Sequence, residues 1–328
     1  MNKEIVFTAP NTAELWEFEL PPLGETEIRG RTVCSLISPG TETAWFTQGE
    51  YPLKPGYAAV FEAQELGSKV NSIKPGQLVL CMGGHRSAQQ FDEKYVVSLP
   101  EGMSASTGVI ARLMGVSMTT LMTTKARPGD KVIVSGAGPV GYLAAHQCKL
   151  AGYEVAVIDP NPQRREEAIK SGLNALPSFP LEDPDYAKKV ALVIDCSGHE
   201  AAILDACRIV RKNGEVVLVG VPWKANTDML AHAILNEVFF NYVNLRSGWE
   251  WEVPLLSRDF VWEELYEGYN NAPYSTFDGF KRALKWLSLD GVIPLNDLTQ
   301  DLKMDDPQAI YSDLVSGKLT KPFNVLNW

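Results

Sequence analysis

A glycine-rich segment in the middle of the chain constrains the fold more than any other feature. Residues 132–141 read Val-Ile-Val-Ser-Gly-Ala-Gly-Pro-Val-Gly. The apolar run at their start lacks polar alternation, which is typical of a strand buried on both faces. Gly136 then allows a tight turn, Gly138 lets a pyrophosphate approach the backbone, and Gly141 lets the following helix pack closely on the strand. Free N–H groups and the positive end of the helix would meet the phosphates, so the segment predicts dinucleotide binding.

An acidic residue downstream supports this interpretation. Asp159 ends the next apolar run, 18 residues after Gly141, where such motifs place a carboxylate for the ribose hydroxyls. A carboxylate accepts hydrogen bonds from the 2′-hydroxyl and repels a 2′-phosphate, which predicts NAD rather than NADP. Arg164 follows closely and would soften the repulsion, so NADP stays open. An ordinary strand–turn–helix junction with a coincidental acid is the alternative.

The order of the segments predicts an α/β protein with two domains. Residues 124–291 alternate strand-like and helix-like patterns, as in parallel βαβ units. Residues 1–123 hold short strand-like runs separated by turn signals such as Pro39-Gly40, and residues 292–328 return to that style. A nucleotide-binding domain inserted into a mostly antiparallel β domain is therefore expected. In the inserted domain, strands are expected at 131–135, 154–159, 192–195 and 215–220, and helices at 140–151, 163–171 and 200–210.

Composition and charge exclude several classes of function. The chain of 328 residues carries a formal net charge of −10, which opposes binding to nucleic-acid phosphates and to anionic membrane surfaces. It has no apolar run of about 18 residues that could span a membrane, and its N-terminus does not read as a secretory signal. Its five cysteines include no C-x-x-C pair, so neither a disulfide framework nor a cysteine-rich zinc site is expected. A reducing, cytoplasmic location fits.

The β region, segment 132–141 and two later segments together resemble the medium-chain dehydrogenases/reductases over nearly the whole chain. The later segments are 193–198, Val-Ile-Asp-Cys-Ser-Gly, and 214–220, Gly-Glu-Val-Val-Leu-Val-Gly. The resemblance implies a GroES-like β domain and an inserted Rossmann domain with a doubly wound parallel sheet. It also implies an NAD or NADP cofactor, a small-molecule substrate bound between the domains, and a homodimer or homotetramer. The cofactor contacts that it implies are Gly136, Gly138, Pro139, Val140, Gly141, Asp159, Arg164, Ser197 and Gly220.

The chain departs from the zinc-using members of this family at the positions where they bind the metal. Their Cys-Gly-Ser/Thr-Asp run is matched here by 39–42, Pro-Gly-Thr-Glu, and their Gly-His-Glu run by 56–58, Gly-Tyr-Ala. The third ligand falls near Met114, and residues 82–91, where the structural zinc lobe would lie, contain no cysteine. A catalytic zinc needs three protein ligands, so an enzyme without zinc is expected. The alternative is a site rebuilt from Cys81, His85 and Glu93.

Three residues are candidates for the acid–base work that zinc does elsewhere in the family. Thr41 matches the family's proton-relay hydroxyl, and Tyr57 replaces a metal ligand, so its phenol would point into the same pocket and donate a hydrogen bond to a substrate oxygen. His85 lies in a glycine-flanked loop, and histidine titrates near neutral pH. Each has an alternative, because Thr41 could cap a turn or helix, Tyr57 could shape a pocket wall, and His85 could lie on the surface.

Three further residues are candidates for substrate binding. Glu42 would orient Tyr57 or a substrate hydroxyl, and Arg112, on an apolar segment, would bind a substrate oxygen or the cofactor phosphates. Trp249 follows a late strand-like run, in a zone that in the family approaches the nicotinamide and the subunit interface. A solvated glutamate, an ion pair at the domain junction and core packing are the respective alternatives.

Three functions remain open from the sequence. The first is zinc-independent, NAD-dependent hydride transfer between nicotinamide and a C–OH or C=O group of a polyol, sugar or ring alcohol, which Thr41 favours. The second is NADPH-dependent reduction of quinones or activated double bonds, against which Asp159 counts. The third is dinucleotide binding without catalysis.

Overall fold

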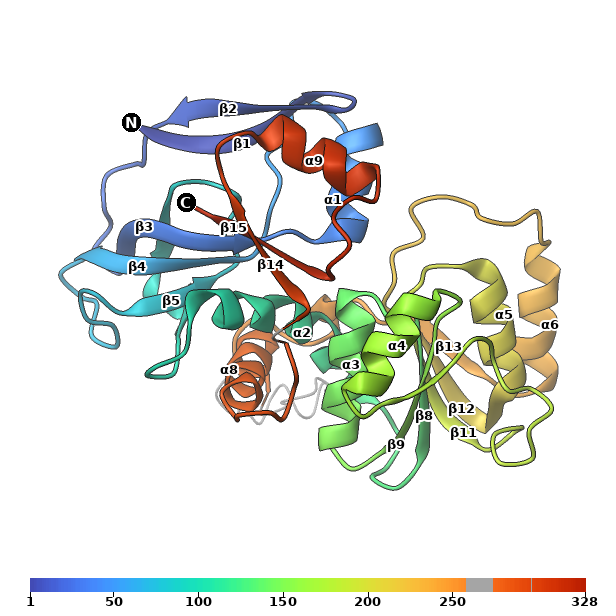
Figure 1. Ribbon diagram of the computed structural model, residues 1–328. Coiled ribbons are helices and arrows are strands. Elements are labelled where there is room, and N and C mark those ends of the chain that lie inside the picture. Colours follow the sequence, from blue (N-terminus) through green and yellow to red (C-terminus); the bar gives the residue numbers. More distant parts are fainter. Residues whose placement is uncertain (258–273, 296) are drawn as a thin grey trace. The chain divides into compact units, whose positions relative to one another are not determined.

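The chain forms two compact units in the computed structural model (Figure 1). The residues that the structure describes are 1–257, 274–295 and 297–328. One unit comprises Met1–Arg112 and Phe280–Trp328, and the other comprises Leu113–Gly279. Both junctions fall inside helices, α2 (Ala105–Thr123) and α8 (Thr276–Leu287), earlier in the chain than the predicted boundaries at 123 and 291. Among the described residues, no helix is long and apolar enough to cross a membrane.

The unit Leu113–Gly279, called here the nucleotide unit, is built on a parallel sheet. Its strand order is β10-β9-β8-β11-β12-β13, and each neighbouring pair runs parallel. The chain moves outward from β8 in one direction and then returns to start again on its other side. Doubly wound sheets bind ligands at this reversal point. The strands are β8 (Lys131–Ser135), β9 (Glu154–Ile158), β10 (Asn174–Leu176), β11 (Val190–Asp195), β12 (Val210–Leu218) and β13 (Asn244–Ser247).

Apolar layers on both faces explain why these strands lack polar alternation. Val132 and Val134 of β8 pack into one layer, and Ile133 packs into the other. Helix α3 (Pro139–Leu150) contributes to the first layer and α5 (Glu200–Ile209) to the second. Fully burying a Val or Ile side chain stabilises the fold by about 1.5–3 kcal/mol. The predicted α/β class is confirmed. The unit also contains α4 (Pro162–Lys170), α6 (Ala231–Phe240) and the 3-10 turn η2 (Glu250–Glu252).

The other unit, called here the β unit, contains one large sheet and a separate hairpin. The sheet has the order β14-β15-β3-β4-β5-β7, with β6 also paired to β3. Its pairs are antiparallel except β14 with β15, and β1 and β2 form the hairpin. The strands are β1 (Asn2–Ala9), β2 (Thr12–Phe18), β3 (Glu27–Leu36), β4 (Ala59–Leu66), β5 (Leu78–Cys81), β6 (Ala88–Asp92), β7 (Val96–Ser98), β14 (Thr299–Lys303) and β15 (Phe323–Asn327).

Helices in the first part of the chain are the main difference from the sequence prediction of a mostly antiparallel β region. Helix α1 (Pro39–Gln48) starts at the Pro39-Gly40 pair that the sequence suggested was a turn. Proline is well tolerated at the first helical position, because its missing N–H would have no intrahelical partner there. Helix α9 (Pro307–Val315) lies next to α1, and the 3-10 turn η1 (Glu93–Tyr95) precedes β7. The tail therefore supplies side chains to the start of α1.

Candidate functional site

The glycine loop joins β8 to α3 in the nucleotide unit. Gly136 has a φ of 92°, which residues with a side chain rarely adopt. A Cβ on Gly141 would lie 1.7 Å from the carbonyl oxygen of Gly136, so loop and helix approach too closely for another residue. A Cβ on Gly138 would meet nothing within 4 Å, which leaves space beside the first turn of α3, at Pro139 and Val140. The N–H groups of such a turn can hold a phosphate.

The acid after β9 is folded back onto the glycine loop. Asp159 is 2% exposed, and its two carboxylate oxygens accept the N–H groups of Ala137 and Asn161, each at 2.8 Å. Arg164 Nη1 lies 3.6 Å from Asp159 Oδ2. Each carboxylate oxygen has two lone pairs, so Asp159 can accept a ribose hydroxyl in addition. The neighbouring guanidinium supplies the positive charge that a 2′-phosphate would need, so the geometry accommodates NAD and leaves NADP open.

The loops after β11 and β12 lie beside the glycine loop. Added Cβ atoms on Gly220 and Gly136 would lie 2.8 Å and 3.2 Å from the backbone nitrogen of Ser197. Asp195 holds this junction, because its carboxylate accepts Ser197 Oγ–H at 2.6 Å and Gly198 N–H at 3.0 Å. Desolvation by burial raises the pKa of the Asp195 carboxyl. The predicted cofactor residues thus gather at the carboxyl edge of the sheet, and their contact with a cofactor stays a prediction.

In the β unit, the Thr41 side chain lies close enough to Tyr57 to lower the pKa of its phenol. The Tyr57 ring meets Trp45 edge to face, with 6.1 Å between the ring centroids. Burial and, more weakly, the charge of Glu42 raise the pKa of the Tyr57 phenol, while the Ser38 side chain, the charge of Arg112 and, least of all, the Thr41 side chain lower it. Because the pKa of a free tyrosine is already about 10, the phenol is protonated at neutral pH and can donate a hydrogen bond.

Arg112 contacts Tyr57 through both its ring and its backbone. The guanidinium carbon lies 4.8 Å from the Tyr57 ring centroid and 5.4 Å from that of Phe280. Arg112 Nε donates to the Tyr57 carbonyl oxygen at 3.2 Å, and Arg112 is 3% exposed. A cation in this position favours negative charge on the phenol oxygen and fixes the ring by a cation–π contact. The predicted contact of Arg112 with a substrate stays a prediction.

Glu42 and His85 meet each other in the interior of the β unit, where both are at most 1% exposed. His85 Nε2 lies 2.9 Å from Glu42 Oε2, and His85 Nδ1 lies 2.8 Å from Ser35 Oγ. The Tyr311 hydroxyl donates to Glu42 Oε2 at 2.5 Å, and Ser38 N–H donates to Glu42 Oε1 at 2.8 Å. Both ring nitrogens of His85 are therefore engaged by protein groups. The predicted roles of Glu42 in orienting Tyr57 or a substrate hydroxyl and of His85 in acid–base work stay predictions.

The residues at the matched metal-ligand positions have other surroundings here. Met114 is fully buried in α2. Of the rebuilt set considered from the sequence, Cys81 is buried and its pKa is raised to about 12 by desolvation, which disfavours the thiolate that binds metals. Glu93 accepts Asn71 N–H at 2.9 Å on the surface. Within the described part of the chain, no three His, Cys, Asp or Glu side chains form a group that could hold a metal.

Trp249 lies in the nucleotide unit, after β13, and is 68% exposed, so it does not pack in a core. Ser38, whose side chain lowers the pKa of the Tyr57 phenol, was not among the site residues predicted from the sequence. Its place directly before Pro39 is a helix N-terminus signal that would have identified it as the residue preceding α1.

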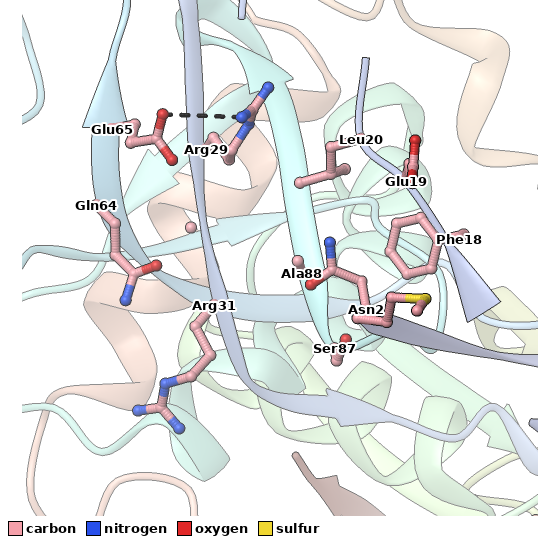
Figure 2. Close-up of a pocket in the computed structure, with 12 residues that line it drawn as sticks. Asn2, Phe18, Glu19, Leu20, Arg29, Arg31, Gln64, Glu65, Ser87 and Ala88 are labelled. Carbon is pink, nitrogen blue, oxygen red and sulfur yellow. Dashed lines mark ion pairs between the residues drawn. The ribbon is translucent and has the colours of Figure 1, made fainter. Parts of the chain in front are cut away.

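A separate hollow of about 560 Å³ lies on the β unit (Figure 2). Its lining comes from the N-terminus, the end of β2 and parts of β3, β4 and β6. Arg29 and Glu65 form an ion pair there, with 3.7 Å between the charged atoms. None of the predicted site residues lines this hollow.

Comparison with known proteins adds an independent observation. A family model described as zinc-binding dehydrogenase matches residues 139–256. Sorbitol dehydrogenase of Homo sapiens is 24% identical over 295 residues, which cover 74% of this chain and 82% of that protein. The structure of 2R,3R-butanediol dehydrogenase from Bacillus subtilis aligns with a TM-score of 0.78 at 17% identity over 100% of both chains. That of a quinone oxidoreductase from Pseudomonas syringae pv. Tomato aligns with 0.75 at 18%, also over 100% of both.

The chain is thus similar, in sequence and in fold, to members of the medium-chain dehydrogenase/reductase superfamily. The relatives are named dehydrogenases and support an enzyme role for this chain, so the third function considered from the sequence, binding without catalysis, is set aside. The matched family model covers part of the nucleotide unit. Pro39 and Tyr57 lie outside it, so the words zinc-binding in its description do not locate a metal in this chain.

Proposed function

We propose that this enzyme is a zinc-independent, NAD(H)-dependent oxidoreductase that acts on a C–OH or C=O group of a polyol, sugar or ring alcohol. The observation that carries the proposal is the environment of Tyr57. The phenol stands at the position matched to a metal ligand, with the Ser38 and Thr41 side chains and the Arg112 charge acting on it. Zinc would polarise a substrate oxygen by its charge, and this group of side chains offers a hydrogen-bond donor in its place.

The chemistry follows from the protonation state of the phenol. A bound nicotinamide dinucleotide supplies or accepts the hydride. In the reductive direction Tyr57 donates its hydrogen bond to the substrate carbonyl oxygen and stabilises the negative charge that develops there. Arg112 makes the phenol a stronger acid than burial alone would allow, and in this mechanism the Thr41 hydroxyl passes on a proton. In the oxidative direction the alcohol proton passes to the Tyr57 oxygen while the phenol's own proton leaves through the Thr41 hydroxyl to water.

The choice of NAD is supported by Asp159, whose buried carboxylate borders the glycine loop. The half-exposed Arg164 lies beside Asp159 and could pair with a 2′-phosphate, so we expect NAD to be preferred over NADP without NADP being excluded. The polyol class is supported by the relative named sorbitol dehydrogenase. Reduction of quinones with NADPH is the competing function, and the NADPH that it needs would be accommodated if the Arg164 guanidinium turned from Asp159 to a 2′-phosphate.

The proposal is tested on one purified sample. NADH and NADPH are titrated by nicotinamide fluorescence, zinc is measured by elemental analysis, and a panel of polyols, sugars, ring alcohols and quinones is screened for turnover. We expect tighter binding of NADH than of NADPH, no stoichiometric zinc and turnover of an alcohol. Stoichiometric zinc would contradict the zinc-independent mechanism. Preferred NADPH with turnover of quinones alone would establish the competing function.

We further propose that the enzyme is a cytoplasmic homo-oligomer, a dimer or a tetramer. Strand β13 is at one end of the strand order in the nucleotide unit, and large apolar side chains of that unit are exposed, including Phe239, Phe240 and Trp249. Exposed large apolar side chains that lie together, as Phe239 and Phe240 do, can mark interaction sites. All five cysteines are free thiols, which suits a reducing compartment. Light scattering coupled to size-exclusion chromatography distinguishes these states from a monomer, which would contradict the proposal.

A further inference from the structure

Arg112 is a charged side chain in an apolar stretch of helix. It lies on α2 and is 3% exposed, while its neighbours on the helix, from Val109 to Ala111 and from Leu113 to Met114, are at most 1% exposed. Removing a charge from water is costly unless polar or aromatic partners surround it. An apolar side chain of similar volume would fill the same space without that cost. The contacts that only a guanidinium can make therefore have to offset the burial of Arg112.

Two of those contacts are made with Tyr57. The guanidinium carbon lies over the Tyr57 ring, 4.8 Å from its centroid, and Nε–H donates to the Tyr57 carbonyl oxygen at 3.2 Å. The same guanidinium lies over the ring of Phe280, on α8, at 5.4 Å, and Phe280 is 1% exposed. Arg112 thus holds the ring and the main chain of Tyr57 and is itself supported by a second buried ring.

The ring that supports Arg112 is fixed by helix packing. Phe280 follows Gly279, where α8 meets α2. An added Cβ on Gly279 would lie 3.2 Å from Met118 Cγ and 3.3 Å from Met122 Cε, so the two helices approach more closely there than a side chain easily allows. Because Arg112 and Phe280 project from these two packed helices, little freedom is left for the guanidinium.

Tyr57 lies in a segment that has no regular structure of its own. Residues 54–58 form neither helix nor strand, and Tyr57 is half-buried. Tyrosine rings at such positions flip and change rotamer unless their neighbours hinder them. Trp45, on α1, meets the ring edge to face, with an angle of 74° between the ring planes. Arg112 contacts the same ring and also binds the main chain, so it is placed to order both parts of Tyr57.

A positive charge alone would not need an arginine at this position. Against burial, which raises the pKa of the Tyr57 phenol, the Arg112 charge lowers it, and a lysine would bring the same charge. A planar guanidinium can pack on an aromatic ring and direct an N–H to a carbonyl at the same time, whereas the lysine ammonium is a compact charge on a flexible stem. The two contacts with Tyr57 therefore depend on the shape of the arginine side chain.

We propose that Arg112 is a positioning residue that holds Tyr57 in one orientation, with its guanidinium packed on the Tyr57 ring, its Nε–H on the Tyr57 carbonyl oxygen, and Phe280 supporting it from α8. The inference rests on the proposed function, in which Tyr57 meets the substrate oxygen. Misplacing a reacting group by about 1 Å can cost about 10²-fold in rate, so the orientation of the phenol bears directly on turnover. This role requires no contact between Arg112 and the substrate.

The test uses two substitutions that separate shape from charge. Arg112→Lys keeps the charge and removes the planar contact, and Arg112→Met removes both. The enzyme is labelled with tyrosine carrying ¹³C at both ring Cε positions, the Tyr57 signals are assigned by their loss in Tyr57→Phe, and the ring-flip rate is measured from line shapes over temperature. We expect the rate to rise at least about tenfold in both variants, because the contact that hinders the flip is lost. A rate that rises only in Arg112→Met, or in neither variant, would overturn the proposal.

Arg86→Lys is the matched control. Arg86 lies in the same unit, and its guanidinium carbon lies 5.7 Å from the ring centroid of Phe18 and 6.0 Å from that of Phe91. The control therefore makes the same substitution at another arginine that contacts two rings, and it leaves the contacts of Tyr57 in place. We expect the Tyr57 flip rate to stay unchanged. An equal rise in Arg86→Lys would reflect a general loosening of the β unit and would overturn the proposal.

Phe280→Leu is a second variant in case the substitutions at Arg112 do not fold. It removes the supporting ring from the guanidinium and changes no charge. We expect it to raise the Tyr57 flip rate, with the fold intact by circular dichroism. An unchanged flip rate in Phe280→Leu would show that the guanidinium does not depend on the ring from α8, and would overturn the arrangement proposed.

Kinetics separate this inference from the proposed function. With an alcohol substrate from the screen, Arg112→Lys is expected to lower kcat about tenfold with a smaller change in KM, and Arg86→Lys is expected to leave kcat unchanged. Full kcat in Arg112→Lys would overturn the positioning role, because the charge alone would then suffice. If the unaltered enzyme turns over no alcohol, the proposed function fails, while the flip rate still decides whether Arg112 holds Tyr57.

Discussion

The glycine loop of the nucleotide unit and the Tyr57 surroundings of the β unit are both small polar sites, but they are built in opposite ways. The glycine loop is formed by backbone atoms. A Cβ added to Gly141 would lie only 1.7 Å from the carbonyl oxygen of Gly136, five residues earlier, so no side chain fits there. The surroundings of Tyr57 are side chains brought together by the sheet and by α9, as in the contact between Glu42 and Tyr311. A site made of local backbone tolerates almost no substitution, whereas a site made of distant side chains can be altered one atom at a time.

The largest expected effect is at Gly141. In Gly141→Ala the added methyl would overlap the Gly136 carbonyl, so we expect the free energy of unfolding to fall by about 3 kcal/mol, the upper range for an overpacked core. Gly138→Ala is the contrasting variant, because its methyl meets no protein atom within 4 Å. We expect it to keep its stability and to lose at least about tenfold in NADH affinity, since the methyl occupies the approach of the pyrophosphate. Urea unfolding and fluorescence titration measure the two quantities.

The variants Gly141→Ala and Gly138→Ala can contradict the view that the glycine loop is a binding site built from backbone. If Gly138→Ala binds NADH as tightly as the unaltered enzyme, the space beside α3 does not receive the pyrophosphate. If both variants lose stability equally, the loop is a packing feature and not a binding one.

The next effect is at Tyr57, where a single oxygen is removed. Tyr57→Phe is expected to lower kcat by about 10²–10³-fold, the usual cost of losing one donor to a developing oxyanion. The dissociation constant for NADH, measured by fluorescence, should not change, because the cofactor residues lie in the other unit. An unchanged kcat would return Tyr57 to the alternative of a pocket wall.

A pH experiment examines the helix that carries the glycine loop. Burial lowers the pKa of His146, on α3, from 6.5 to about 4. The unfolded chain therefore binds the proton more tightly, and the stability associated with the neutral histidine is present above pH 6.5 and is lost as the pH falls toward 4. Between pH 7 and pH 5 this amounts to about 2 kcal/mol. Urea unfolding should show that this part of the pH dependence disappears in His146→Gln, and an unchanged dependence would contradict the assignment.

The smallest effect concerns cofactor choice. Asp159→Asn can keep the hydrogen bond from Ala137 N–H but removes the charge opposite Arg164. We expect NADH affinity to fall about tenfold, or about 1.4 kcal/mol, and NADPH affinity to fall less or to rise. Arg164→Gln should weaken NADPH alone. Parallel titrations with both nucleotides give the ratio, and equal losses for both in Asp159→Asn would show that the carboxylate supports the loop without reading the ribose.

The sequence predicts the glycine loop of the nucleotide unit in more detail than the surroundings of Tyr57 in the β unit, for a physical reason. Strand β8 was expected at 131–135 and occupies those residues, because a continuous apolar run between turn signals is a local pattern. The start of α1 was not expected, because a Pro-Gly pair suits both a turn and a first helical turn, and the choice depends on the packing of Phe46 against Tyr311.

The buried hydrogen bonds that link Trp328, Ser35, His85 and Glu42 could not be predicted from the sequence, for a related reason. Glu42 and His85 were each singled out, but as separate candidates for contact with substrate. Their pairing depends on strand register, which no local pattern specifies, and Trp328 and Ser35 are 293 positions apart. Ser38 could have been predicted from the sequence as the residue that precedes a helix, since it stands directly before a proline.

The aromatic packing around Tyr311 has a consequence for how this enzyme can evolve. The ring of Tyr311 is fixed by Phe7 and Phe46, with centroid distances of 4.7 and 5.5 Å, so hydrocarbon contacts decide where its hydroxyl points. A substitution at Phe7 that conserves volume but changes shape would therefore change the direction of the Tyr311 hydroxyl through its effect on the Tyr311 ring. A substitution among these three rings can therefore disturb the buried hydrogen bond to Glu42 as well as the packing of the interior.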